Sequence, residues 1–153
     1  VSLVLKHPEH RILVLSGRKE QSKAIYDKIL ASEEKSVRLL IGEKKIKGEG
    51  TPPRITVAGT KKAGTGFDDP TLTMLILASD CKHVEQWEGR IRTSDNVIYD
   101  LVDDYSAFEN HWKIRNAWYV NKGAVVKVIS QRQRNRALEM PSKRLLQPNT
   151  NNR

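Results

Sequence analysis

The sequence lacks several features that would place it in other protein classes. Its 153 residues include one cysteine, Cys81, which excludes an internal disulfide and a cysteine-rich zinc site and fits a reducing compartment. No apolar run approaches the ~20 residues that a membrane-spanning helix needs. The chain begins with Val1 rather than Met and shows no signal-peptide pattern, so we expect a fragment of a longer protein. Its length is that of one domain with a sizeable core.

Acidic residues are almost missing from the last quarter of the chain. Residues 113–153 contain ten Lys and Arg but a single acid, Glu139, whereas residues 1–112 contain 17 basic and 17 acidic residues. The net charge of +9 therefore arises in the last quarter. A basic segment of this kind is typical of a surface that faces a polyanion such as nucleic acid. A solvated tail that only adds solubility is the alternative.

The chain also lacks a P-loop. Residues 59–66 read GTKKAGTG and come close to the pattern G-x-x-x-x-G-K-[ST], but Thr65 stands where a lysine must bind phosphate. The acid pair D-E-x-[DH] that would hold a magnesium ion is missing as well. The glycine stretch is thus a damaged nucleotide-binding loop, a chance turn, or a loop that approaches a nucleotide in another way.

Apolar runs alternate with amphipathic stretches along most of the chain. Short runs rich in branched residues predict six strands, over residues 11–16, 36–42, 54–60, 71–79, 96–104 and 124–130. Helices are predicted over residues 17–31, 81–92 and 105–123, the last closed by Gly123. Strands that are apolar almost throughout belong in a parallel sheet covered on both faces. We therefore predict an α/β fold, a three-layer α/β/α domain with a mostly parallel central sheet of about six strands.

Composition divides the chain into two parts. Residues 1–130 are predicted to form the domain, and residues 131–153, where Asn, Gln, Arg and Pro replace apolar residues, a basic and mobile C-terminal tail. Within the domain, Phe108, Trp112 and Tyr119 lie close to one stripe of the last helix, which favours core packing over base stacking. The four histidines, at positions 7, 10, 83 and 111, include no pair with convincing metal-ligand spacing, so we predict no metal site.

Two polar stretches follow the third and fourth predicted strands, where an open parallel sheet carries its functional loops. The first, from Thr60 to Asp68, reads T-x-x-A-G-x-G-x-D, and the second, from Gln86 to Arg92, reads Q-x-x-G-R-x-R. With the strand and helix RILVLSGRKEQSKAIYDKI upstream, they resemble motifs V, VI and IV of the second RecA-like domain of superfamily 2 helicases. The nearest members are helicases of large DNA viruses and transcription-type helicases. The resemblance covers residues 11 to about 129.

The resemblance assigns the glycine stretch to motif V rather than to a P-loop. It implies that Thr60 and Lys61 contact the nucleic-acid backbone and that Gly64, Gly66 and Asp68 lie beside the nucleotide. Glycines there allow the backbone to approach either ligand closely. The alternative for the two consecutive aspartates is a turn whose carboxylates cap the next element.

The resemblance assigns catalytic functions to motif VI. Gln86 and Arg90 match the motif, and an arginine at the second position acts as a finger that stabilises negative charge on the γ-phosphate in the transition state. Such fingers contribute about 10³ to 10⁵ in rate. Arg92 departs from the family, which places the last arginine at the position of Thr93. For Arg90 and Arg92, surface ion pairs with nearby acids are the alternative.

Motif IV is predicted at the end of the first strand. The resemblance implies that Ser16, Gly17, Arg18 and Lys19 bind the nucleic-acid backbone. They precede a helix whose first amide groups favour phosphate, and phosphate contacts would position a strand without reading its sequence. An ordinary solvated loop is the alternative.

The resemblance also implies cofactors and partners. ATP with Mg²⁺ would bind between this domain and an N-terminal RecA-like domain of the same chain, which would supply the P-loop lysine and the metal ligands. The nucleic acid would be single-stranded or duplex DNA or RNA, no membrane is expected, and the isolated fragment is predicted to be inactive. We expect an intracellular location, in cytoplasm or nucleus or, for a viral protein, in host cell or virion.

Two functions of other classes are alternatives. One is a non-enzymatic basic α/β module that grips nucleic acid through its last 40 or so residues. The other is a protein-interaction platform whose docking loop is the polar stretch over residues 43–53. An intact ATPase would separate the helicase from both.

Overall fold

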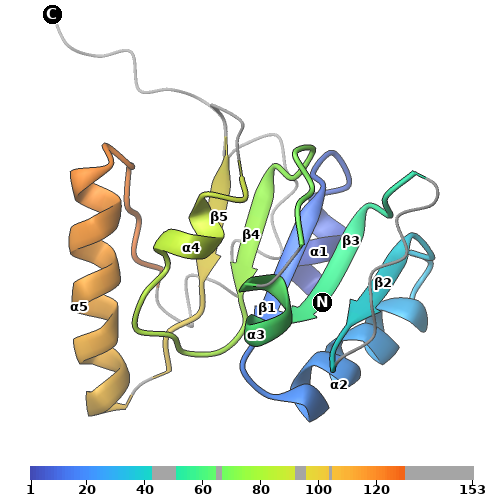
Figure 1. Ribbon diagram of the computed structural model, residues 1–153, viewed down its shortest axis with the longest axis horizontal. Coiled ribbons are helices and arrows are strands. Elements are labelled where there is room, and N and C mark those ends of the chain that lie inside the picture. The colour runs from blue at the N-terminus through green and yellow to red at the C-terminus, as the bar shows by residue number, and fades with distance from the viewer. Residues whose placement is uncertain (43–50, 65–66, 92–95, 104, 130–153) are drawn as a thin grey trace, which may run out of the picture.

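The computed structural model describes residues 1–42, 51–64, 67–91, 96–103 and 105–129 (Figure 1). Its centre is a sheet of five parallel strands in the order β2-β3-β1-β4-β5. The strands are β1 (Ile12–Ser16), β2 (Val37–Leu40), β3 (Ile55–Gly59), β4 (Met74–Leu77) and β5 (Val97–Asp100). All residues of the central strand β1 are buried, whereas those of the edge strands β2 and β5 are half-buried.

Helices cover both faces of the sheet. On one face, α1 (Ser2–Lys6) and α2 (Lys19–Leu30) pack on the side chains that include Ile12 and Val14. On the other, α3 (Thr60–Gly64), α4 (Glu85–Glu88) and α5 (Ser106–Asn121) pack on Leu13, Leu15 and their neighbours. Figure 1 shows α3 and α4 in front of the sheet and α1 behind it. The predicted three-layer α/β/α fold with a parallel sheet is confirmed.

Strand register brings three chain segments together at the carboxyl edge of the sheet. Ser16 at the end of β1 is paired with Gly59 at the end of β3, and Leu15 is paired with Leu77 at the end of β4. The chain passes from β3 to β4 across β1, so the loops after these three strands leave the sheet beside one another. This edge is where functional loops of open parallel sheets lie.

The structure corrects several predicted elements. The sixth strand is wrong: residues 124–129 form no strand, and Val125 and Val128 are 86% and 78% exposed. A mostly apolar run forms a strand only where a neighbouring backbone supplies hydrogen bonds, and no pairing of β5 with these residues exists in the described ranges. Within the described residues 81–91, the helix predicted over residues 81–92 is reduced to α4, which ends at Glu88 with Gly89 as its C-cap. The last helix closes as predicted, with Gly123 at a φ of 79°.

A buried polar network docks α5 against the ends of β4 and β5. The guanidinium of Arg115, 1% exposed, donates to Asp100 over 2.7 and 3.0 Å and to Asp80 over 3.0 Å. The hydroxyl of Tyr119 donates to Asp100 over 3.0 Å, and Nδ1 of His111 lies 2.5 Å from Asp80. Every ionised group is thus compensated by an opposite charge or a hydrogen bond, as burial requires.

This network also sets the chemistry of the single cysteine. Burial raises the pKa of the Cys81 thiol to about 11, the charge of Arg115 opposes the rise, and the nearby aspartates add to it. Burial and the carboxylate of Asp100 likewise raise the pKa of Tyr119. The thiol therefore stays protonated at neutral pH and is a weak nucleophile.

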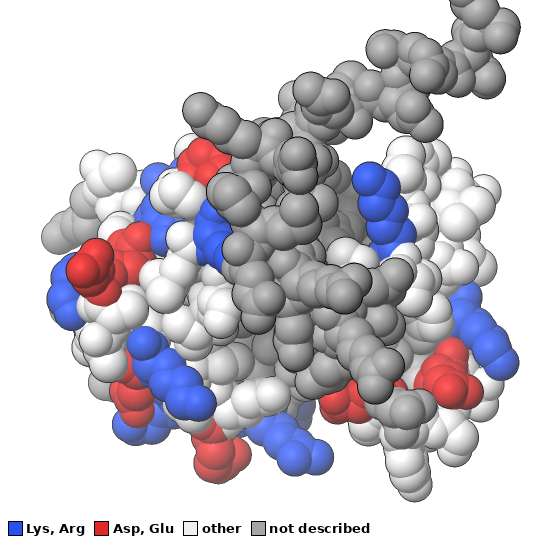
Figure 2. All heavy atoms as spheres, turned by 180° about the vertical axis from the view of Figure 1, so that it is seen from behind, with Lys and Arg blue, Asp and Glu red and all other residues white. Residues whose placement is uncertain are grey.

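Charges of both signs are interspersed on the face of the molecule that Figure 2 shows. Figure 2, seen from behind, shows lysine and arginine alternating with aspartate and glutamate, without a patch of one sign among the residues drawn in colour. This agrees with the balanced charge of residues 1–112. In the described part of the chain, no helix has the length and apolar character needed to cross a membrane. The predicted tail, residues 131–153, lies outside the described residues.

Candidate functional site

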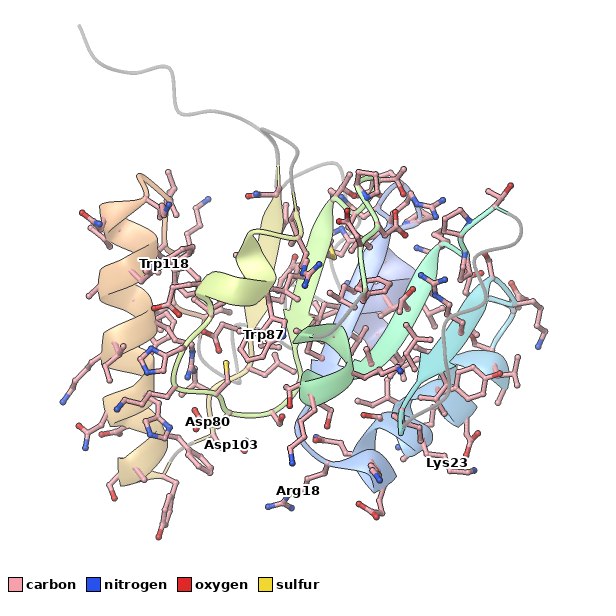
Figure 3. All side chains as sticks on the ribbon, viewed as in Figure 1. Arg18, Lys23, Asp80, Trp87, Asp103 and Trp118 are labelled. Carbon is pink, nitrogen blue, oxygen red and sulfur yellow. The ribbon has the colours of Figure 1, made fainter. Side chains whose placement is uncertain are left out.

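The turn between β1 and α2 presents its polar groups at the carboxyl edge of the sheet. Gly17, Arg18 and Lys19 are exposed, and Figure 3 shows Arg18 at this edge, extending away from the sheet. The amide of Gly17 donates to Oγ of Ser79 in the loop after β4 over 2.6 Å. Ser16 differs from the other three, because its side chain is buried and its hydroxyl donates to Gln21 over 2.5 Å.

The stretch T-x-x-A-G forms the short helix α3, directly after β3. Its first residue, Thr60, is half-buried, and Lys61 is exposed. Because Ser16 and Gly59 are paired, the residues that follow them, Gly17 and Thr60, leave the sheet as neighbours. Motif IV and the start of motif V therefore share one edge, as the order of the strands requires.

The far end of motif V is anchored in the core. Phe67 is 1% exposed, and the guanidinium carbon of Arg38 lies 5.3 Å from the centre of its ring. Asp69 is buried and accepts hydrogen bonds from the amide and hydroxyl of Thr71 over 3.0 and 2.5 Å. The turn-capping interpretation is thus confirmed for Asp69, while Asp68 is exposed.

Motif VI follows the loop after β4 and packs on the same face as α3. Trp87 is buried between α4 and the sheet, where it belongs to the core cluster that also contains Ala63 and Phe67 (Figure 3). Beyond α4, the guanidinium of half-buried Arg90 donates to the carbonyl oxygens of Phe67 and of Gly64, the latter over 3.4 Å. The arginine of motif VI and the glycine stretch of motif V therefore lie against each other.

Three predicted site residues cannot be placed in this arrangement. Gly66 and Arg92 lie outside the described residues, and Gln86 lies in α4 without a described side chain. The described site consequently brings together Gly17, Thr60 and Arg90 through the motif V segment between them.

Proteins of large DNA viruses are similar to the chain, whereas no protein-family model matches it. It is 35% identical over 126 residues to "Putative helicase 055L" of frog virus 3, covering 81% of the chain and 28% of that protein. It is 28% identical over 148 residues to "Putative helicase 161L" of invertebrate iridescent virus 6, covering 83% and 34%. Over 84 residues it is 36% identical to uncharacterized protein 108L of invertebrate iridescent virus 3, covering 52% of the chain and 81% of that protein.

Solved structures of other proteins share its fold. Dbp5 of S. cerevisiae, bound to RNA and ADP BeF3, gives a TM-score of 0.60 at 15% identity, covering 93% of this chain and 40% of Dbp5. The C-terminal part of the Fun30 ATPase domain gives 0.57 at 15% identity, covering 85% of this chain and 45% of that one. The chain has the RecA-like fold of these structures. It spans about a third or less of the two viral proteins named putative helicases, at 34% and 28%.

Within this domain, two groups of polar residues were not identified from the sequence. Arg115 and its aspartates come from α5 and from two strand ends, so that only the fold reveals the network. His7, Glu9 and His10 meet in the loop before β1. The prediction of no metal site considered only the spacing of histidine pairs, whereas the third side chain of this group is the glutamate between His7 and His10. The core interpretation of Trp112 and Tyr119 is confirmed, since Tyr119 belongs to the core cluster that contains Leu13 and Leu15 and Trp112 packs against it.

Proposed function

We propose that this chain is the C-terminal motor domain of an ATP-dependent nucleic-acid helicase or translocase. It would supply motifs IV, V and VI to a composite ATPase site, and an N-terminal RecA-like domain would supply the phosphate-binding lysine and the ligands for Mg²⁺. The similarity to two viral helicases supports this proposal, and so does the lack of a P-loop lysine in the chain. The protein would act inside the cell, on DNA or RNA.

The contact between Arg90 and motif V carries the proposal. A guanidinium held by the carbonyls of Gly64 and Phe67 stands beside the segment assigned to the nucleotide. We assign Arg90 as the arginine finger that stabilises charge on the γ-phosphate when the two domains close. Gln86 and Arg92 are assigned to the same motif, and Gly64, Gly66 and Asp68 to the nucleotide side of motif V.

Nucleic acid would bind at the neighbouring edge of the sheet. Arg18, Lys19 and Lys61 are exposed cations there, and Thr60 and the amides at the start of α2 offer hydrogen-bond donors to phosphate. Because Gly17 has no side chain, the sugar-phosphate backbone of the nucleic acid could approach the protein backbone closely there. Ser16 would act indirectly, because its hydroxyl is already used to hold the turn through Gln21.

Motif V is the physical link between the two ligands. Thr60 begins α3 beside the nucleic-acid edge, and Gly64, the last residue of the same short helix, contacts Arg90. A nucleotide that draws Arg90 away from these carbonyls would remove contacts from one end of this short helix. The resulting shift at Thr60 would change the grip on nucleic acid, which is the differential contact that coupling requires.

The decisive experiment replaces Arg90 in the full-length protein. Arg90→Ala should lower nucleic-acid-stimulated ATP turnover by about 10³-fold or more, with the affinity for nucleic acid kept within a few-fold. Arg18→Ala is the matched comparison. It should weaken nucleic-acid binding but leave the rate of ATP turnover at saturating nucleic acid unchanged. ATP turnover that survives Arg90→Ala, or magnesium-dependent turnover by residues 1–153 alone, would disprove the assignment of the motifs.

A further inference from the structure

Three metal-ligating side chains converge in the loop between α1 and β1. Nδ1 of His7 lies 3.3 Å from Oε1 of Glu9, and Nε2 of His10 lies 3.5 Å from the same oxygen. Ligand atoms from the three residues all lie within 4.8 Å of one another. In the described part of the chain, this is the one such group of three.

These separations match the ligand shell of a tetrahedral metal ion. Zinc binds imidazole nitrogen and carboxylate oxygen at about 2.0–2.2 Å, which places neighbouring ligand atoms of a tetrahedron about 3.3–3.5 Å apart. Two of the three edges already have this length, both from the glutamate oxygen to a histidine nitrogen. An ion can therefore enter with small side-chain rotations.

The ring nitrogens that face away from the cluster are held by hydroxyl groups. Nε2 of His7 lies 2.9 Å from the hydroxyl of Tyr99 in β5, and Nδ1 of His10 lies 2.9 Å from Oγ1 of Thr73 before β4. Metal-bound histidines usually donate their second ring N–H to a neighbour of this kind, which orients the ring. When these nitrogens carry the protons, both free lone pairs point toward Glu9.

The backbone of the loop is held in place independently. Nη1 of Arg54 donates to the carbonyl oxygens of His7 and His10 over 3.0 and 3.2 Å. Arg54 is itself fixed by Glu34, to which its Nε donates over 2.7 Å. The site is thus preorganised by residues of other elements, which lowers the entropic cost of binding an ion.

We propose that His7, Glu9 and His10 bind one divalent transition-metal ion, with zinc as the best chemical match. Two imidazoles favour zinc over magnesium or calcium, which prefer oxygen ligands, and a set of two histidines and one glutamate leaves a fourth position for water. The side chain of Glu9 is 61% exposed, so the ion has a path from solvent. Tyr99 packs on the face of the sheet opposite to α3 and α4, so this ion is distinct from the magnesium of ATP.

The test measures metal binding by the untagged chain, residues 1–153, after removal of metals with EDTA. Titration with ZnCl2 by calorimetry should give one site per chain, and Co²⁺ should produce the visible absorption of a tetrahedral complex. Glu9→Gln and His10→Ala should each weaken zinc binding at least about 10-fold. Tyr99→Phe, which removes only a partner of His7, should weaken it about 10- to 100-fold.

The matched control is His83→Ala, which removes a histidine 3.5 Å from Glu85. It should leave the zinc affinity unchanged, because the described residues supply no third ligand to that pair. Far-ultraviolet circular dichroism checks that each variant is folded. Equal losses in His83→Ala and Glu9→Gln, or no stoichiometric site in the unmodified chain, would mean surface coordination only and overturn the proposal. No nucleotide is present, so the result is independent of the proposed ATPase function.

Discussion

At the scale of single residues, Arg115 is the most constrained charge in the described domain. Its guanidinium is fully buried by α5 and is compensated by Asp80 and Asp100. Although burial alone lowers the pKa of Arg115, the hydrogen bonds and charge of Asp100 and Asp80 outweigh that effect and raise it. The cation is therefore permanent, and removing it would leave two acids close together without a counter-charge.

We predict that Arg115→Met lowers the free energy of unfolding by about 3–5 kcal/mol, because breaking a buried ion pair from one side leaves an uncompensated charge. Equilibrium unfolding in urea, followed by circular dichroism, measures the change. Lys113→Met is the matched control, since Lys113 is exposed on the same helix and its replacement should change stability by less than about 0.5 kcal/mol. Similar losses in the two variants would show that Arg115 contributes no more than a surface residue.

Residues differ in how far their surroundings could be predicted. Arg90 was found because motif spacing places it beside motif V, and its contacts with Gly64 and Phe67 agree with that placement. Arg115 stands in the stretch HWKIRNAW, where nothing distinguishes it from its exposed neighbour Lys113. Its burial depends on carboxylates contributed by two strand ends, and such long-range pairing leaves no local signal.

At the scale of elements, Arg54 and Glu34 join three segments. Glu34 follows α2, Arg54 precedes β3, and Arg54 also holds the loop before β1. Partial burial by itself raises the pKa of Glu34, but the amide of Ser36 and the hydrogen bond and charge of Arg54 outweigh it, so the pKa is lowered. The folded chain thus binds the Glu34 proton more weakly than the unfolded chain does.

This lowered pKa fixes the sign of a pH effect. The stabilisation is present above the ordinary pKa of 4.5 and is lost as the pH falls through the lower pKa of the folded state. Between about pH 6 and pH 3, the free energy of unfolding should therefore fall less steeply for Glu34→Gln than for the unmodified chain, by about 1 kcal/mol. Urea unfolding at a series of pH values checks this difference. Parallel pH profiles would show that the ion pair adds nothing.

Strands buried on both faces could be predicted from the sequence. Features that depend on contacts with distant segments could not. Residues 12–15 and 74–77 are apolar throughout because both faces of β1 and β4 are covered, so the sequence alone identifies them as interior parallel strands. The apolar run over residues 124–129 carries the same signal without a partner strand. His7, Glu9 and His10 are close in the sequence, but the orientation of the two rings depends on hydroxyls from β5 and from the loop before β4, which no local pattern contains.

At the scale of the whole molecule, positive charge is divided between two regions. Residues 131–153 contain six Lys and Arg against one acid, while residues 1–112 are balanced. Residues 113–130 contain four Lys and Arg and no acid, so the domain of residues 1–130 carries a net charge of +4 and the basic segment one of +5. Both regions therefore contribute to the long-range attraction for a polyanion. A motor domain would contact nucleic acid through the carboxyl edge of the sheet, whereas a simple basic module would contact it through the basic segment.

Salt dependence separates these two contributions. Removal of residues 131–153 should lower the affinity for single-stranded nucleic acid and reduce the slope of log K against log salt by up to about 4, at about 0.7 for each of six lost phosphate contacts. The truncated chain should keep residual binding through the β1–α2 turn. In that truncated chain, Arg18→Ala should reduce the slope further by about 1. Fluorescence anisotropy at several salt concentrations gives both slopes.

Lys23→Ala is the matched control for this series, because Lys23 (Figure 3) is exposed on α2, directly after the turn that contains Arg18, but is paired with Asp27 at 2.7 Å. It should leave the slope of the truncated chain unchanged. If truncation removed all binding and Arg18→Ala had no effect, nucleic acid would be held by the basic segment alone. The carboxyl edge of the sheet would then not bind nucleic acid. The proposed coupling through α3 from Arg90 to Thr60 could therefore not change nucleic-acid binding.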